Sequence, residues 1–167
     1  YVFKNQNSML QKFVFIILVL GFNVLFAQNK SEEIAIKNVI HTFFEGLHKG
    51  DSTIMKNTLP TNLKIQTKST NKKGVPILKT ETRNQLLTSI AKKNPEYVYL
   101  EKLLSYTIKI DGNLASVWTP YEFYFNEKFS HCGANSFQLF NDNGTWKIIY
   151  LVDMRRREDC NYLKEKN

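Results

Sequence analysis

The chain has 167 residues and a formal net charge of +8 at pH 7, and its length suits one domain with a hydrophobic core of ordinary size. Its lysines are scattered along the sequence, whereas a nucleic-acid-binding protein gathers basic side chains on one face and interleaves them with aromatic ones. The charge therefore indicates a solvated basic surface and argues against a nucleic-acid partner.

Residues 1–27 are predicted to be upstream residues followed by a secretory signal peptide. An apolar run from Phe13 to Phe26 follows a basic residue, and Ala27 is the small residue that signal peptidase requires. Residues 1–8 precede the candidate start Met9 and resemble translated upstream sequence. A retained membrane anchor is the alternative, but the run of 14 residues is shorter than the span of about 20 that a transmembrane helix needs.

Cleavage after Ala27 would leave one mature domain, residues 28–167, with 140 residues and a formal charge of +6. We therefore expect an exported protein, periplasmic or secreted, with no stable membrane span after cleavage. An exported protein also rarely meets nucleic acid, which strengthens the argument from the scattered lysines.

Three helices are predicted before the main sheet, because apolar residues recur at steps of three and four between capping and stop signals. Ser31 is the expected cap of the first helix and Gly50 its stop. Residues 61–79 are polar and suggest two short strands around a lysine-rich loop. The expected helices are Ser31 to His48, a short helix from a cap at Asp51 or Ser52 through Leu59, and Glu81 to Lys93 after a cap at Thr80.

The rest of the chain predicts an antiparallel sheet, because apolar and polar residues alternate between turn signals. Asn143-Gly144 is a strong hairpin signal, and Asp111-Gly112 marks another turn. Helices first and strands last indicate an α+β domain in which the helices cover one face of the sheet. The expected strands are Leu103 to Ile110, Leu114 to Phe125, His131 to Phe140 and Thr145 to Met154.

A two-residue turn at Asn143-Gly144 predicts which side chains share a face of the last hairpin. His131 and Arg156 then continue the core face at its open end. Asp153 and Cys132 project from the other face with Arg155, unless a bulge reverses them. The core-facing strand positions carry no acidic residue in this register. The predicted core face comprises Phe137, Leu139, Trp146, Ile148, Tyr150 and Val152.

Two large aromatic residues fall on the outward side of the predicted sheet. The Asp-Gly turn groups Ile108 and Ile110 with the core-facing residues of the next strand, which leaves Trp118 and Tyr124 pointing outward. Large aromatic residues are unusual on a solvated surface and suggest a protein–protein contact. A homodimer is the contact that we expect.

Cys132 and Cys160 are the only cysteines. In an exported chain two cysteines are expected to form a disulfide, and closing this loop would contribute about 3–4 kcal/mol in the chain-entropy model. A reactive Cys132 thiol beside His131 is the alternative. The three histidines are far apart in the sequence and no Cys-x-x-Cys spacing occurs, so no metal site and no cofactor are expected.

Three short segments carry a resemblance to a known superfamily. Ser130-His131-Cys132-Gly133, Gly144-Thr145-Trp146-Lys147-Ile148 and Asp153-Met154-Arg155-Arg156 resemble exported bacterial members of the nuclear transport factor 2-like superfamily, some described as lumazine-binding proteins. The order of elements over about residues 30–155 is also similar. The resemblance implies a cone-shaped fold, in which three N-terminal helices cover a curved antiparallel sheet, with a pocket inside the cone.

Superfamily members act as enzymes (ketosteroid isomerases, scytalone dehydratases, polyketide cyclases), as ligand binders or as docking surfaces, so the fold leaves function open. We expect binding of a small apolar or aromatic molecule in the pocket. A cofactor-independent isomerase, dehydratase or cyclase that uses His131 with Asp153 or Tyr121 is the alternative, and an interaction (dimer) domain is the second alternative. The expected ligand-binding residues are Tyr121, His131, Trp146, Tyr150 and Arg156.

Two of these candidates have simpler structural explanations that stay open. His131 is suited to acid–base chemistry because imidazole titrates near neutral pH, but it can also cap a strand end. Asp153 can orient His131 or act as a base, but it can also form a salt bridge with Arg155 or Arg157. Sequence alone does not decide between these roles.

Overall fold

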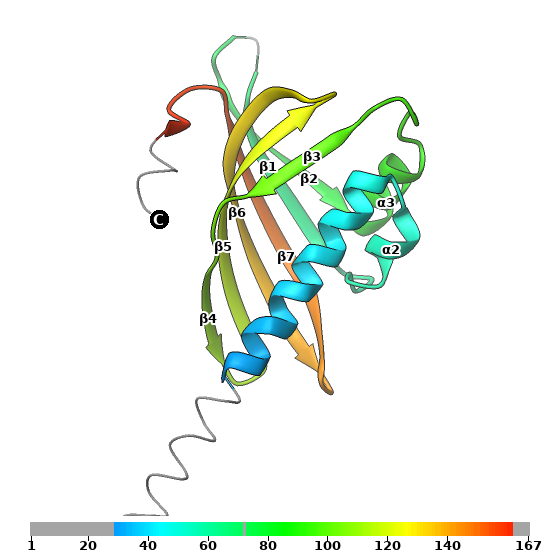
Figure 1. The fold of residues 1–167 in the computed structure, drawn as a ribbon, viewed down its shortest axis with the longest axis vertical. Helices are drawn as coiled ribbons and strands as arrows, with labels where there is room; N and C mark the ends of the chain where they lie inside the picture. The colour runs from blue at the N-terminus through cyan, green and yellow to red at the C-terminus, as the bar shows by residue number, and fades with distance from the viewer. Residues whose placement is uncertain (1–28, 72, 162–167) are drawn as a thin grey trace, which may run out of the picture. The chain divides into compact units, whose positions relative to one another are not determined.

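The computed structural model describes residues 29–71 and 73–161 (Figure 1). The predicted upstream residues and signal peptide lie outside the described residues. The chain falls into two compact units, one ending at Ala35 and the other beginning at Ile36, and the sheet lies entirely within the second. No helix in the described part of the chain is long and apolar enough to cross a membrane.

The first helix runs over residues 29–49. It is already helical two residues before Ser31, so Ser31 lies within it and the predicted cap is wrong. Gly50 ends the helix as predicted, because its φ of +70° is a left-handed conformation that glycine adopts without steric cost. Phe43 and Phe44 pack their rings at 6.2 Å against Phe137 of the sheet, which fixes the helix on that face.

Two shorter helices follow. Helix α2, Ser52–Lys56, is capped by Asp51, whose carboxylate accepts hydrogen bonds from the first turn, as predicted. Helix α3, Arg83–Ala91, begins after Thr82, which forms a capping box with Gln85. The cap predicted at Thr80 is wrong because the preceding strand continues through Thr82.

The strands form one curved, open sheet with the order β2-β1-β7-β6-β5-β3, and β4 pairs with β5 beyond this path (Figure 1). The sheet was expected to be wholly antiparallel, but it is mixed. Strand β1 lies between β2, with which it pairs antiparallel, and β7, with which it pairs in parallel. Helices and sheet together give the predicted α+β fold. The strands are β1 Lys64–Thr70, β2 Pro76–Thr82, β3 Tyr99–Leu103, β4 Thr107–Asp111, β5 Leu114–Phe125, β6 Lys128–Asp142 and β7 Thr145–Arg156.

The region predicted as one strand, Leu103 to Ile110, is two strands in the structure. Strand β3 begins earlier, at Tyr99, and β4 begins after a break, at Thr107. Strand β3 pairs with the far half of β5, so that Glu101 lies opposite Phe123. Strand β3 therefore brings the carboxyl group of Glu101 into the sheet, although the sequence predicted no strand at this residue.

A bulge in β7 changes which side chains face the core. The turn at Asn143-Gly144 has positive φ at both residues, as the predicted hairpin requires. Leu139 then pairs with Ile148 but Gln138 pairs with Tyr150, so Ile149 is an extra residue. Every later residue of β7 therefore lies on the opposite face from the one that simple parity predicts.

Candidate functional site

The inner face of the sheet is the face that carries Phe137 and packs against the first helix, and the other face is the outer face. Cross-strand pairs divide the inner face of β5, β6 and β7 into rows. The rows nearest the Asn143-Gly144 turn are apolar and buried: Ala115–Leu139–Ile148 and Val117–Phe137–Leu151. The next rows are polar: Thr119–Asn135–Asp153, Tyr121–Gly133–Arg155 and Phe123–His131.

We call the second region the polar end of the inner face. Strand β3 adds Glu101 beside it, through the pairing of Glu101 with Phe123. The polar end comprises Glu101, Thr119, Tyr121, His131, Asn135, Asp153 and Arg155. These residues come from four strands, so only the folded sheet brings them together.

Asp153 lies at the centre of one hydrogen-bonded group. The Tyr121 hydroxyl donates to Oδ1 of Asp153 at 2.6 Å, and Nε of Arg155 donates to its Oδ2. Tyr121 is fully buried and Asp153 is 7% exposed. Burial and the negative charge of Asp153 hold the pKa of Tyr121 well above its ordinary value, so Tyr121 stays a hydrogen-bond donor.

Glu101 forms the second group with Asn135. The Asn135 amide donates to Oε1 of Glu101 at 2.6 Å. Burial raises the pKa of Glu101 to about 8, although the hydrogen bond from Asn135 acts in the other direction, and the nearby Asp153 adds to the rise. Glu101 is therefore a carboxyl group that holds a proton at neutral pH and can release it just above.

Sequence reasoning missed Glu101 because β3 was not recognised. The signal was present in the run Tyr97-Val98-Tyr99, whose aromatic and β-branched residues favour a strand. The inference that core-facing strand positions carry no acidic residue is wrong for two reasons. Strand β3 places Glu101 at the polar end, and the bulge turns Asp153 to the inner face.

His48 connects the first helix to the strand that carries Glu101. Its Nε2 accepts a hydrogen bond from the backbone N–H of Glu101 at 2.9 Å, and its ring stacks on Phe44. Burial lowers the pKa of His48, and electrostatic interaction with the nearby His41 and Lys93 acts in the same direction. The imidazole is therefore neutral near pH 7 and can accept this bond.

His131 lies on the inner face near Tyr121, where the sequence placed it. Its ring stacks on Phe123 with centroids 4.8 Å apart and meets the edge of Tyr121 at 5.8 Å. Ser130 Oγ lies 3.1 Å from its Nδ1. Burial and the positive charge of Arg155 lower the pKa of His131 to about 4, so it is neutral at pH 7 and a weak base.

Gly133 makes room for Tyr121 within this group. A Cβ at Gly133 would lie 1.9 Å from the carbonyl oxygen of Met154 and 2.7 Å from the Tyr121 hydroxyl. Only glycine fits where a side chain and a neighbouring strand approach this closely. The glycine in the middle of β6 therefore permits the contact between Tyr121 and Asp153.

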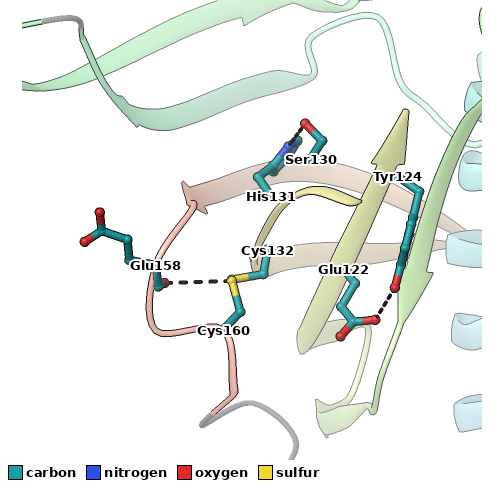
Figure 2. Close-up of a disulfide and its surroundings, with 7 residues drawn as sticks. All are labelled: Glu122, Tyr124, Ser130, His131, Cys132, Glu158 and Cys160. Carbon is teal, nitrogen blue, oxygen red and sulfur yellow. Dashed lines mark hydrogen bonds between the residues drawn. A yellow bond between two sulfur atoms is a disulfide. The ribbon is translucent and has the colours of Figure 1, made fainter. Parts of the chain in front are cut away.

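Cys132 and Cys160 form the predicted disulfide, with Cα atoms 5.8 Å apart (Figure 2). The alternative of a reactive Cys132 thiol is wrong, since the described residues contain no free cysteine. Cys132 is fully buried and pairs across the sheet with Glu122 and Arg156 on the outer face. The disulfide therefore holds Cys160 on the outer face of the sheet. His131, the residue before Cys132, faces inward.

Three predicted site residues lie elsewhere. Because the bulge precedes it, Tyr150 lies on the outer face. There its hydroxyl donates a hydrogen bond to Gln66. Arg156 is also turned outward by the bulge, opposite Cys132, so its predicted place beside His131 is wrong. Trp146 is on the inner face, but it is 3% exposed and lies at the apolar end, away from the polar rows.

The outward aromatic residues lie on the predicted face. Trp118 is 48% exposed on β5. Tyr124 is half-buried, and its hydroxyl donates to Glu122, a buried residue of the outer face. The homodimer that these residues suggested stays a prediction.

No metal site is found among residues 29–71 and 73–161, which hold no group of three or more side chains suited to bind one. At the polar end Glu101 can exchange a proton near neutral pH, Asn135 has a second amide N–H to donate, and Arg155 can bind an anion.

Comparisons with solved structures identify the fold. A nuclear transport factor 2-like (NTF2-like) protein of unknown function from Shewanella baltica OS155 is 20% identical, with a TM-score of 0.56 over 77% of this chain and 96% of that chain. A proposed ketosteroid isomerase from Shewanella frigidimarina NCIMB 400 is 19% identical, with a TM-score of 0.53 over 71% of this chain and 94% of that one.

A third similar structure is the beta subunit of a proposed aromatic-ring-hydroxylating dioxygenase from Novosphingobium aromaticivorans DSM 12444. It is 12% identical, with a TM-score of 0.63 over 76% of this chain and 90% of that chain. No family model and no curated protein matches this sequence. The chain therefore has the NTF2-like fold, as predicted, while the resemblance to lumazine-binding members stays a prediction.

Proposed function

We propose that the domain binds a small, largely apolar or aromatic molecule at the polar end of the inner face. The observation that carries the proposal is Thr119, which is fully buried and whose Oγ1 has no hydrogen-bond partner within the described ranges. A buried hydroxyl left unsatisfied costs about 1–3 kcal/mol. A polar atom of a bound molecule that hydrogen-bonds to Thr119 would remove this cost. Thr119 lies in the same row as Asn135 and Asp153, so such a molecule would meet these polar groups too.

The edge of the polar end offers contacts for the apolar part of such a molecule. Tyr99, Phe123 and His131 are each partly exposed, and their rings form a connected group. Aromatic side chains that line a concave face and surround a few polar groups are typical of small-molecule sites. The flat rings favour an aromatic ligand.

The test is direct binding to the mature protein. Native mass spectrometry should retain a copurified molecule, and titration with 2-naphthol and with lumazine should shift the amide resonances of Thr119 and Asn135. Those of Trp118 and Ser136, which pair with each other on the outer face, should stay in place. A Thr119→Val variant should bind more weakly. No copurified molecule and no shift with either probe would overturn the proposal.

A second candidate function is a cofactor-independent isomerase, dehydratase or cyclase. The observation that favours it is Glu101, because a carboxyl with a pKa of about 8 can take and return a proton near neutral pH. In this scheme Glu101 is the base, and Arg155 stabilises the negative charge that develops on the substrate, while Asp153 holds Arg155 and Tyr121 in place. His131 contributes as a neutral ring.

Proton abstraction can be followed without knowing the natural substrate. In D₂O, 2-tetralone should gain deuterium next to its carbonyl faster with the native protein than with Glu101→Gln. The rate should rise with pH as the Glu101 carboxyl loses its proton around pH 8. A rate equal in both proteins would exclude Glu101 as the base and leave the binding function in place.

Export remains part of the proposal. The disulfide between Cys132 and Cys160 supports it, because such bonds persist in oxidising compartments. Fusing residues 1–40 to a phosphatase that is active only outside the cytoplasm should give active enzyme in bacteria. An inactive but intact fusion would contradict export.

A further inference from the structure

Arg155 has donors that the polar end does not use. Its Nε donates to Asp153, and this is the only hydrogen bond that it forms with residues 29–71 and 73–161. A guanidinium carries five N–H donors, so the four on its terminal nitrogens remain for another partner. The side chain is 50% exposed, so a dissolved molecule can reach it.

The hydrogen bond to Asp153 holds the Arg155 guanidinium. Asp153 lies two residues earlier on β7 and accepts from its Nε, and the residue opposite Arg155 on β6 is Gly133, which has no side chain. A guanidinium held through Nε keeps the two parallel N–H groups of its outer edge in one orientation. That edge matches the two oxygens of a carboxylate.

The electrostatics around Arg155 favour a single negative charge. Asp153 balances Arg155, and Glu101 adds little negative charge at pH 7 because its pKa is about 8. Arg157 lies close enough to His131 to help lower the pKa of that ring, so it adds positive charge at the same edge. A monoanion would neutralise this excess, whereas a dianion would leave a net negative charge at this edge.

An aromatic surface lies beside the guanidinium. The His131 ring, whose pKa responds to Arg155, stacks on Phe123 at 4.8 Å, and Phe123 lies 5.8 Å from Tyr99. A molecule whose anionic group binds Arg155 would therefore have its apolar body next to these partly exposed rings.

We propose that the outer edge of Arg155 binds the carboxylate of the ligand, so that the ligand class is a small aromatic monocarboxylate. This inference rests on the proposed function and deepens it. Arg155 anchors the charged group, the rings of Tyr99, Phe123 and His131 hold the aromatic body, and the buried row of Thr119 receives any further polar atom.

The experiment compares 2-naphthoate with its neutral analogue 2-naphthamide, by isothermal calorimetry at pH 7. The native protein should bind 2-naphthoate about tenfold more tightly, since a charge-assisted bidentate contact is lost in the amide. Arg155→Gln should bind both probes equally, and Arg155→Lys should keep part of the preference. Arg156→Gln is the matched control, because it removes the neighbouring guanidinium on the outer face and should keep the full preference.

Circular dichroism and the intact disulfide should confirm that each variant is folded. If Arg155→Gln does not fold, Arg155→Lys takes its place in the comparison. Equal affinity for the two probes in the native protein, or an unchanged preference in Arg155→Gln, would overturn the carboxylate assignment and leave the proposed function standing. Displacement of 2-naphthoate by equimolar inorganic phosphate would overturn the monocarboxylate class. Failure of 2-naphthoate, 2-naphthamide and 2-naphthol to bind would overturn the proposed function as well.

Discussion

The two ends of the inner face are built on the same three strands but differ in chemistry. At one end, Phe137, Leu139 and Ile148 are fully buried, and Phe137 packs against two phenylalanines of the first helix. At the other end, the equivalent positions one or two rows along carry Tyr121, Asn135 and other polar residues. The contrast arises from the side chains of these strands, from the bulge in β7 that turns Asp153 to the inner face, and from β3, which adds Glu101.

The contrast separates stability from function. Burial of apolar side chains stabilises a fold, whereas burial of carboxyl, amide and hydroxyl groups costs free energy unless every group is paired. The polar end keeps an unpaired Thr119 hydroxyl, and burial raises the pKa of the Glu101 carboxyl to about 8. Residues that weaken a fold in this way are characteristic of binding and catalytic sites.

The largest expected effect is at the apolar end. Phe137→Ala should lower the free energy of unfolding by about 3–5 kcal/mol, because it removes a fully buried ring that contacts two phenylalanines of the first helix. Urea denaturation measures the loss. The matched control is Phe140→Ala on the same strand, which is 43% exposed on the outer face and should lose less than about 1 kcal/mol. Equal losses would mean that the core is placed wrongly.

The next effect concerns the close approach at Gly133. Gly133→Ala should destabilise the protein by about 1–3 kcal/mol, because the added methyl would collide with Met154 and with the Tyr121 hydroxyl. The Tyr121 ring resonances should move as the ring leaves Asp153. Ser136→Ala, a half-buried change on the same strand, should do neither. A native-like Tyr121 in Gly133→Ala would show that the glycine is not needed.

Glu101 gives a pH-dependent comparison. Between its ordinary pKa of 4.5 and about 8, the folded protein holds a proton that the unfolded chain releases, so this carboxyl lowers stability as pH rises. Glu101→Gln keeps an acceptor for Asn135 but cannot ionise. The variant should therefore gain stability relative to the native protein by about 3–4 kcal/mol between pH 5 and pH 8. A difference that does not change with pH would contradict the raised pKa.

The smallest effect on stability is expected at Trp118 on the outer face. Trp118→Glu should change the free energy of unfolding by less than about 0.5 kcal/mol, since the side chain is 48% exposed. It should weaken self-association at least about tenfold in analytical ultracentrifugation if the predicted homodimer forms through this face. Asn62→Glu introduces the same charge at another exposed site and should have no effect. A monomeric native protein would rule out the homodimer.

Much of the fold was predictable because its signals are local. The Asn143-Gly144 turn, the stop at Gly50 and the cap at Asp51 each depend on a few adjacent residues. The face of β7 beyond Ile149 was not predictable in the same way. The bulge adds one residue to β7, and no glycine or proline marks its position in the sequence. One extra residue is enough to turn Asp153 onto the inner face and Arg156 onto the outer face.

The site was predictable only in part for the same reason. His131 and Tyr121 were placed near each other because they lie on β6 and β5, and the bulge in β7 does not change the pairing of these two strands. The two carboxyl groups were not placed at the site. The position of Asp153 depends on the bulge, and the position of Glu101 depends on the pairing of β3 with β5. Pairing between segments separated in sequence is a property of the whole sheet and leaves little trace in any one strand.

The most direct test is the pKa of the Glu101 carboxyl in the native protein, measured by ¹³C NMR with Glu101→Gln to assign the resonance. We predict a value of about 8, which reflects burial beside Asn135 and Asp153. A value near 4.5, the ordinary pKa of a solvated glutamate, would contradict the description of the polar end as a desolvated site that holds a proton.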